Sequence, residues 1–234
     1  GASMITALLK ETCNNIEQAK HLKKAQSEIK DIEATSNELE KLLTSTRQLA
    51  LTTTTCGERL GTAIIASVLA QLPPITQEVQ NSKQRFNSSN RRETLALYNV
   101  GRKVQATYTD LSERWKLYAQ DQLAPYLELL RLVMYLPEVA ANQTKIQELT
   151  ASIKQHAEKP PQHKAQLAQF DERLRQLGEY LDSIAHLPKE VQSFLGKVVE
   201  GTATLADLNS TILQWIQDSN RSSSFSISFI TRRS

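Results

Sequence analysis

The feature that most constrains the fold is a long stretch, from Ile5 to Thr54, that contains neither glycine nor proline. Apolar residues recur along it at spacings of three and four, the periodicity of one face of an α-helix. In its second half, two series of residues are each spaced by seven. The first series is Leu22, Ile29, Ser36, Leu43 and Ala50, and the second is Ala25, Ile32, Leu39, Thr46 and Thr53. This heptad pattern predicts one very long, coiled-coil-like helix.

The larger apolar members of the two series form a predicted seam, which consists of Leu22, Ile29, Ile32, Leu39 and Leu43. Polar residues interrupt the seam, so we expect the helix to pack inside a bundle more than to form a strong isolated zipper. Upstream, Ile5, Leu9 and Ile16 follow a shifted frame, which predicts a stutter between residues 16 and 22. The seam is covered either within the chain or by a second copy, and the pattern does not choose between them.

Composition favours helix along the whole chain. The 234 residues include only seven Gly and seven Pro, and only 6% are aromatic, whereas the good helix formers Ala, Leu, Gln, Glu and Lys are abundant. We therefore predict an all-α fold: an elongated antiparallel helical bundle with long coiled-coil-like helices and a short C-terminal β-strand or extended tail.

The chain divides into four predicted parts. Residues 1–3 resemble an expression scar, residues 4–136 form the long-helix region, residues 137–220 form a C-terminal helical hairpin with short helices, and residues 221–234 form the tail. We expect a break at Pro73-Pro74. We also expect helices at 138–158 and 163–187 to form an antiparallel hairpin, because a short connection returns the second helix alongside the first.

The tail has a pattern of its own, because Ser224 to Phe229 alternates strictly between polar and apolar residues. This is the signature of a β-strand with one apolar face. No other convincing strand is predicted, and a lone strand leaves its backbone donors and acceptors unpaired. Phe225, Ile227 and Phe229 are therefore candidates for contact with a partner, either a sheet edge in another protein or the same tail of a second copy. The alternative is a disordered or merely packed tail.

The longest apolar run extends from Ala63 to Leu72 and is stopped by Pro73-Pro74. It is too short to span a bilayer, for which about 20 residues are needed. We expect a helix that is buried on all sides, and a membrane is not expected as a partner. The alternative is a membrane-active, pore-forming-like protein in which residues 62–72 insert after a conformational change.

No arrangement of residues in the sequence indicates catalysis. The four histidines are scattered, and none lies at metal-ligand spacing from another histidine or a cysteine pair. Phosphate-binding and nucleophile motifs are also absent. Cys13 and Cys56 lie at opposite ends of the predicted first helix, roughly 65 Å apart, which excludes a disulfide between them. We expect no enzymatic activity, no cofactor and no metal site.

Basic residues at the start of the central helix, Arg91, Arg92, Arg102 and Lys103, are the candidate contacts for an anion such as a nucleic-acid phosphate. The net charge is only +3, and acidic residues are interspersed along the chain. Weak nucleic-acid binding is therefore an alternative that the charge pattern disfavours.

The sequence thus predicts a non-enzymatic helical interaction or scaffold protein, a subunit or adaptor of an intracellular complex. Its expected partners are another protein or a second copy of the chain, as in a homodimer. Because the residues after Met4 lack the pattern of a secretory signal, a cytoplasmic location is expected.

Overall fold

The structure is a computed structural model that describes residues 1–88 and 94–230. Within these ranges the chain is helical and forms no β-strand, which confirms the predicted all-α class. The α-helices are α1 (Ala2–Leu60), α2 (Ala66–Ser88), α3 (Thr94–Val133), α4 (Pro137–Ala140), α5 (Gln143–Glu158), α6 (Lys164–Ile184), α7 (Lys189–Glu200) and α8 (Ser210–Gln217). Two 3-10 helices, η1 (Leu205–Asp207) and η2 (Asp218–Ser224), precede and follow α8.

The chain divides into two compact units, residues 1–111 and residues 112–234. The division falls inside α3, which contributes its first part to the first unit and the rest to the second. The boundary predicted after residue 136 lies at the turn between α3 and α4.

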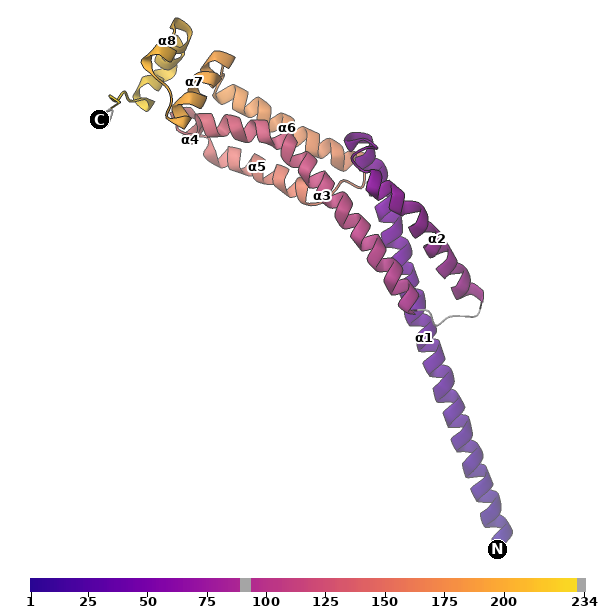
Figure 1. The fold of residues 1–234 in the computed structure, drawn as a ribbon. Coiled ribbons are helices and arrows are strands. Elements are labelled where there is room, and N and C mark those ends of the chain that lie inside the picture. Colours follow the sequence, from indigo (N-terminus) through magenta and orange to yellow (C-terminus); the bar gives the residue numbers. More distant parts are fainter. Residues whose placement is uncertain (89–93, 231–234) are drawn as a thin grey trace, which may run out of the picture. The chain divides into compact units, whose positions relative to one another are not determined.

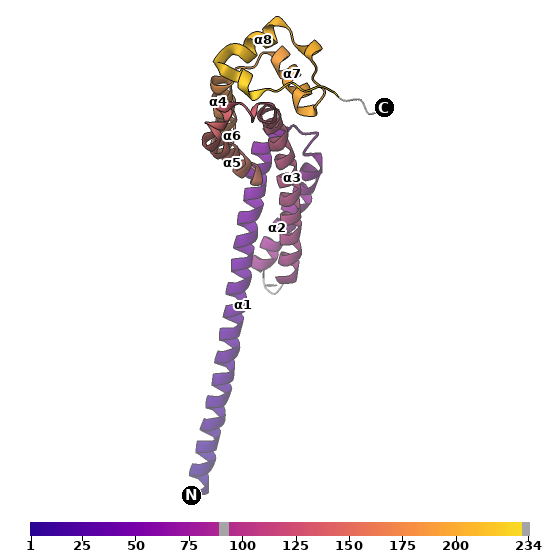
Figure 2. The ribbon, with the colours of Figure 1, turned by 90° about the vertical axis from the view of Figure 1, so that its left-hand side faces the viewer.

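In the first unit, the second half of α1 packs with α2 and the first part of α3 (Figures 1 and 2). A turn at residues 61–65 reverses the chain, so that α2 runs antiparallel to α1. Ser67 Oγ donates a hydrogen bond to Asp110 Oδ2 over 2.7 Å, and Lys103 Nζ lies 2.7 Å from Glu78 Oε1. These two contacts hold α2 and α3 antiparallel. The enclosed side chains include Leu42, Leu49, Cys56, Val68, Ile75, Val79, Val104 and Leu111.

The threonine-rich end of α1 is buried although it is polar. Thr52, Thr53 and Thr55 are all buried. Each hydroxyl donates a hydrogen bond to the carbonyl four residues earlier, over 2.7 to 3.0 Å. These bonds satisfy the buried hydroxyl groups within the helix, and threonine then packs much as an aliphatic residue would.

In the second unit, α3, α5 and α6 pack around Trp115, which is fully buried. The indole Nε1 donates a hydrogen bond to the carbonyl of His156 over 3.1 Å, and the ring meets Phe170 edge-on with centroids 5.1 Å apart. One indole thus joins all three helices. The predicted antiparallel hairpin is confirmed and consists of α5 and α6, with bounds 143–158 and 164–184.

The C-terminal part of the second unit is held by one buried cation. Arg221 Nε lies 2.8 Å from Glu138 Oε1, its Nη1 donates to the carbonyl of Trp215 over 3.0 Å, and its guanidinium lies 4.5 Å from the centre of the Trp215 ring. Trp215 in turn donates through Nε1 to the carbonyl of His186 over 3.3 Å. These contacts connect η2, α8, α4 and the linker that precedes α7.

The break expected at Pro73-Pro74 is absent, because α2 runs through both prolines. The first helix continues through Gly57 to Leu60, and Gly61, whose φ is 88°, follows it. At Gly57 a Cβ atom would come within 2.8 Å of Ile65 Cδ1, so the missing side chain makes room for the chain after the turn.

The apolar run after the first helix is not buried on all sides as predicted. Ile65 and Val68 are buried, whereas Ile64 and Leu69 are 48% and 37% exposed. The run forms the α1–α2 turn and the first turns of α2, and only one face of it contacts α1 and α3.

Candidate partner-binding surfaces

The first half of α1 has no helix packed against it within the first unit. Figures 1 and 2 show this half extending beyond the ends of α2 and of the first part of α3. Every residue from 1 to 31 is exposed. The exposed residues include seven large aliphatic side chains, each 50% to 69% exposed: Met4, Ile5, Leu8, Leu9, Ile16, Leu22 and Ile29. We call residues 2–34 the free half of α1 and these seven side chains its aliphatic stripe.

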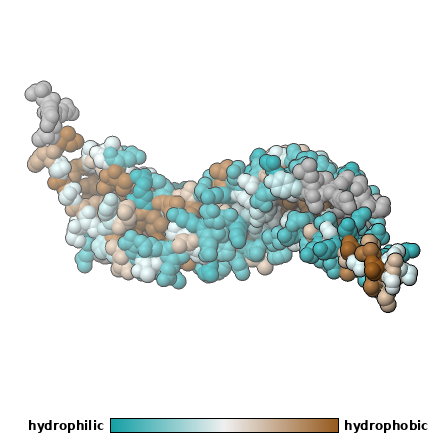
Figure 3. Space-filling model, turned by 90° about the horizontal axis from the view of Figure 1, so that it is seen from below, coloured by the Kyte–Doolittle hydropathy of each residue, from teal (hydrophilic) through white to brown (hydrophobic). Residues whose placement is uncertain are grey.

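The space-filling view supports this description. In Figure 3, which is seen from below, hydrophobic residues gather at the N-terminal end of α1. A helix that is solvated on all sides normally carries apolar residues singly, whereas a series at helical spacing marks a face that packs against something. Because isolated helices are marginal in water, the free half also gains stability from being covered.

The buried half of α1 uses a different register from the predicted seam. Its buried positions are Thr35, Leu42, Leu49 and Cys56 in one series, and Leu39, Thr53 and Leu60 in the other. The second series matches the prediction. The first lies one residue earlier than predicted, so that Leu42 is buried, Leu43 is half-buried and Ala50 is exposed. Adjacent leucines made both registers compatible with the sequence, and packing against α2 and α3 selects one.

The predicted seam residues therefore fall into two groups. Leu39 is buried in the first unit, while Ile32 and Leu43 are half-buried. Leu22 and Ile29 are 60% and 54% exposed and belong to the aliphatic stripe. Extending the buried register toward the N-terminus gives Glu28 and His21 in place of apolar residues, so the stripe occupies a different face of the helix from the bundle seam.

The tail is extended but unpaired in the part of the chain that the structure describes. Phe225 has φ −117° and ψ 143° and is half-buried. Its ring lies 6.2 Å from Phe194 and 6.3 Å from Trp215, centre to centre. Phe225 is thus an anchor of the second unit, and its contact with a partner stays a prediction. Ile227, Phe229 and Ile230 are 79%, 99% and 79% exposed, so the surface available to a partner begins after Phe225.

Two of the four predicted anion contacts lie in the part of the chain that the structure describes. Arg91 and Arg92 lie outside the described residues. Arg102 is exposed, and Lys103 forms an ion pair with Glu78. That carboxylate neutralises the lysine and gives it a structural role between α2 and α3.

A groove in the second unit was not predicted. It has a cavity volume of about 380 Å³ between the end of α3, α4 and α5. Met134, which is 51% exposed, lines it together with Leu130 and Ile146. The Thr150 hydroxyl at the same groove is buried without a hydrogen-bond partner among the described residues.

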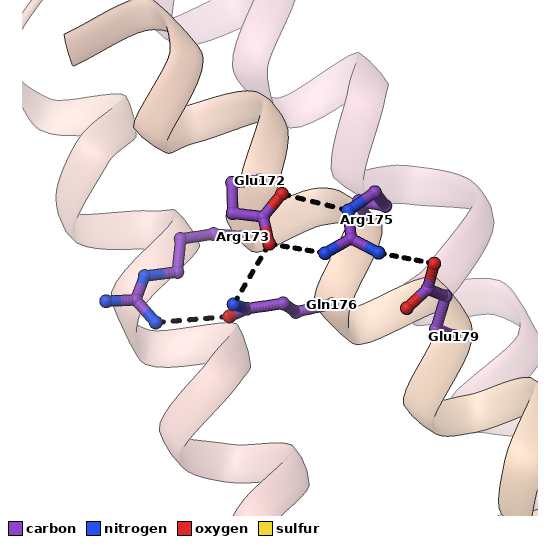
Figure 4. Close-up of polar contacts among 5 residues, drawn as sticks. All are labelled: Glu172, Arg173, Arg175, Gln176 and Glu179. Carbon is purple, nitrogen blue, oxygen red and sulfur yellow. Dashed lines mark hydrogen bonds and ion pairs between the residues drawn. The ribbon is translucent and has the colours of Figure 1, made fainter. Parts of the chain in front are cut away.

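The titratable groups with shifted pKa values include a buried thiol and an exposed ion-pair cluster. Burial raises the pKa of Cys56 to about 12, which keeps the thiol protonated. On α6, Arg175 pairs with Glu172 and Glu179 on an exposed face (Figure 4), and the hydrogen bond from the arginine lowers the pKa of Glu172. No three His, Cys, Asp or Glu side chains lie together as a metal site in residues 1–88 and 94–230. None of the helices in these ranges combines the length and apolar character needed to cross a membrane.

No protein-family model, curated protein or solved structure matches this chain.

Proposed function

We propose that this chain is a non-enzymatic interaction protein, a subunit or adaptor of a complex, which docks a partner helix on the aliphatic stripe of α1. The observation that carries the proposal is the exposure of seven large aliphatic side chains along the free half of α1. Covering them removes apolar surface from water, the main driving force of protein association.

The first unit anchors the docking helix, and the tail of the second unit offers another exposed surface. The second half of α1 is held in a bundle by α2 and α3, so the free half is anchored at one end. An anchored helix loses less conformational entropy on binding than a free peptide would. The exposed tail, Ile227 to Ile230, offers a second and separate contact, which suits addition to a sheet edge.

The proposal includes the cytoplasmic location that the sequence predicts. Cys13 and Cys56 are both free thiols, and Cys13 is exposed. An exposed free thiol fits a reducing compartment.

Site-specific photocrosslinking tests the docking surface whatever its occupant. A benzoyl-phenylalanine replaces Ile16 or Leu22 in cells that produce the protein naturally, and matched controls carry it at Asn14 or His21. These controls point away from the stripe, because successive helical residues are rotated by about 100°. We expect discrete adducts from the two stripe positions and none from the controls. Equal adducts from both faces, or none from either, would contradict the proposal.

Exposure at the α1–α2 turn favours a second candidate function, membrane activity through residues 62–72. Ile64 and Leu69 are exposed there among small residues. Such a protein should release dye from liposomes, and Ile64→Asp should reduce the release. Intact liposomes at high protein concentration would rule this candidate out.

A further inference from the structure

We infer that the occupant of the aliphatic stripe is a second copy of this chain, whose α1 lies antiparallel with Ala19 facing Ala19. This inference rests on the proposed docking function and names its partner. It follows from the order of the stripe residues along the helix and from their exposure.

Four of the seven stripe residues are placed symmetrically about Ala19. Leu9 and Ile29 lie ten residues on either side of Ala19, and Ile16 and Leu22 lie three residues on either side. In an antiparallel pair centred on Ala19, Leu9 of each copy is therefore opposite Ile29 of the other, and Ile16 is opposite Leu22. One helix face thus pairs with itself under a two-fold axis, the commonest symmetry of soluble oligomers.

The interruption in the heptad pattern fits this arrangement. Leu9 and Ile16 are seven apart, and so are Leu22 and Ile29, but the step from Ile16 to Leu22 is six. A six-residue step shifts the stripe by about 120° around the helix, whereas a seven-residue step shifts it by only about 20°. The stripe therefore passes from one side of Ala19 to the other. In an antiparallel coiled coil, a residue on one side of the seam meets, at the same level, a residue on the other side of the partner's seam. The shift at Ala19 places Ile16 and Leu22 on opposite sides, as this pairing requires.

Charge distinguishes the antiparallel pair from the parallel one. Continuing the Leu9–Ile16 series by seven gives Lys23 and then Lys30. A parallel in-register pair would set each of these lysines beside its own copy at the seam, and like charges there repel. In the antiparallel pair, Lys23 is opposite Asn15 and Lys30 is opposite Leu8, so that neither meets a positive charge across the seam.

The size of the surface suits a dimer. The stripe extends over the residues from Met4 to Ile29, about 40 Å of helix. In this register the four symmetric residues of each copy, eight large aliphatic side chains in the pair, cover one another, while Met4, Ile5 and Leu8 lie opposite Ala34, Glu33 and Lys30. A contact of this length is compatible with the roughly 800 Å² per partner that stable interfaces bury.

Disulfide trapping tests the arrangement on the full chain. Both variants carry Cys13→Ser, and one has Leu9→Cys while the other has Ile29→Cys. Cys56 is buried and its pKa is raised to about 12, so it does not compete under native conditions. We expect a disulfide-linked species of twice 26.3 kDa when the two variants are mixed and oxidised, and none from either variant alone.

A matched pair of variants controls for random collision. Asn14→Cys and Lys24→Cys are also equidistant from Ala19, but they point away from the stripe, so their mixture should give no link. A link within the Leu9→Cys variant alone would show a parallel pair and overturn the inference. So would the absence of any link in the mixture. If photocrosslinks from Ile16 and Leu22 then join a different protein, the docking function stands and the second copy is wrong; if those adducts are absent too, both fail.

Discussion

At the scale of single residues, the guanidinium of Arg221 joins η2 to α4 and α8 from a nearly buried position. Its side chain is only 11% exposed, and that of its partner Glu138 is 21% exposed. Replacing it by alanine leaves the carboxylate and the carbonyl of Trp215 without their donor. We expect Arg221→Ala to lower the free energy of unfolding of the second unit by about 2 kcal/mol in urea titrations.

The control for Arg221 is Arg175, which forms more ion pairs but is more exposed to solvent. Arg175 pairs with two carboxylates on α6, and all three side chains are largely exposed (Figure 4). Exposed pairs contribute little, so Arg175→Ala should change stability far less. An equal loss from both variants would mean that burial does not decide the strength of these contacts.

The two thiols should differ in reactivity because one is exposed and the other is enclosed. A thiol reagent at pH 8 should modify Cys13 at once and Cys56 only after unfolding in urea. Burial raises the pKa of Cys56 from 9.0 to about 12, so the folded state holds a proton that the unfolded state loses above pH 9. Stability should therefore fall between pH 9 and 12, by at most about 1.4 kcal/mol per pH unit relative to Cys56→Ser. Rapid modification of both thiols in the native protein would contradict this.

At the scale of elements, we expect the substitution of glycine by alanine to have opposite effects on stability at Gly61 and Gly101. Gly61 follows α1 with φ 88° and ψ 153°, a backbone conformation that is essentially limited to glycine and costs alanine on the order of 1–3 kcal/mol. Gly101 lies inside α3, and nothing lies within 4 Å of the position of an added Cβ. Thermal unfolding should show Gly61→Ala destabilised and Gly101→Ala stabilised by about 0.5–1 kcal/mol. A gain from Gly61→Ala would show that the turn at 61–65 does not need the left-handed backbone.

Sequence patterns predicted which elements are present far better than where they end. Long helices and the second-unit hairpin follow from periodicity alone. The register of α1 did not, because Leu42 and Leu43 are equally apolar and only packing distinguishes them. The burial of Thr52 and Thr53 could not be predicted either, because their bonds to preceding carbonyls are invisible in a sequence. Local patterns also gave no sign that Phe225 packs against Phe194, thirty-one residues earlier, or that residues 130–154 enclose a groove.

At the scale of the whole molecule, we expect Phe225 to be the last residue of the chain that contributes to the stability of the second unit. Residues 226–230 are exposed, so we expect deletion of residues 226–234 to leave the melting temperature and the number of chains per particle unchanged. Deleting residues 221–234 also removes Arg221 and the Phe225 ring, and the second unit should melt earlier. If the shorter deletion alone converts a dimer to a monomer, the tail, and not α1, joins the copies.

Pairing of two copies through the free half of α1 is tested by the molecular mass of the full chain in solution, from light scattering after size exclusion. We expect a mass of twice 26.3 kDa, reduced to that of one chain by Ile16→Glu with Leu22→Glu and unchanged by Asn14→Glu with His21→Glu. A wild-type monomer, or a dimer that survives both charges in the stripe, would contradict pairing through the free half of α1.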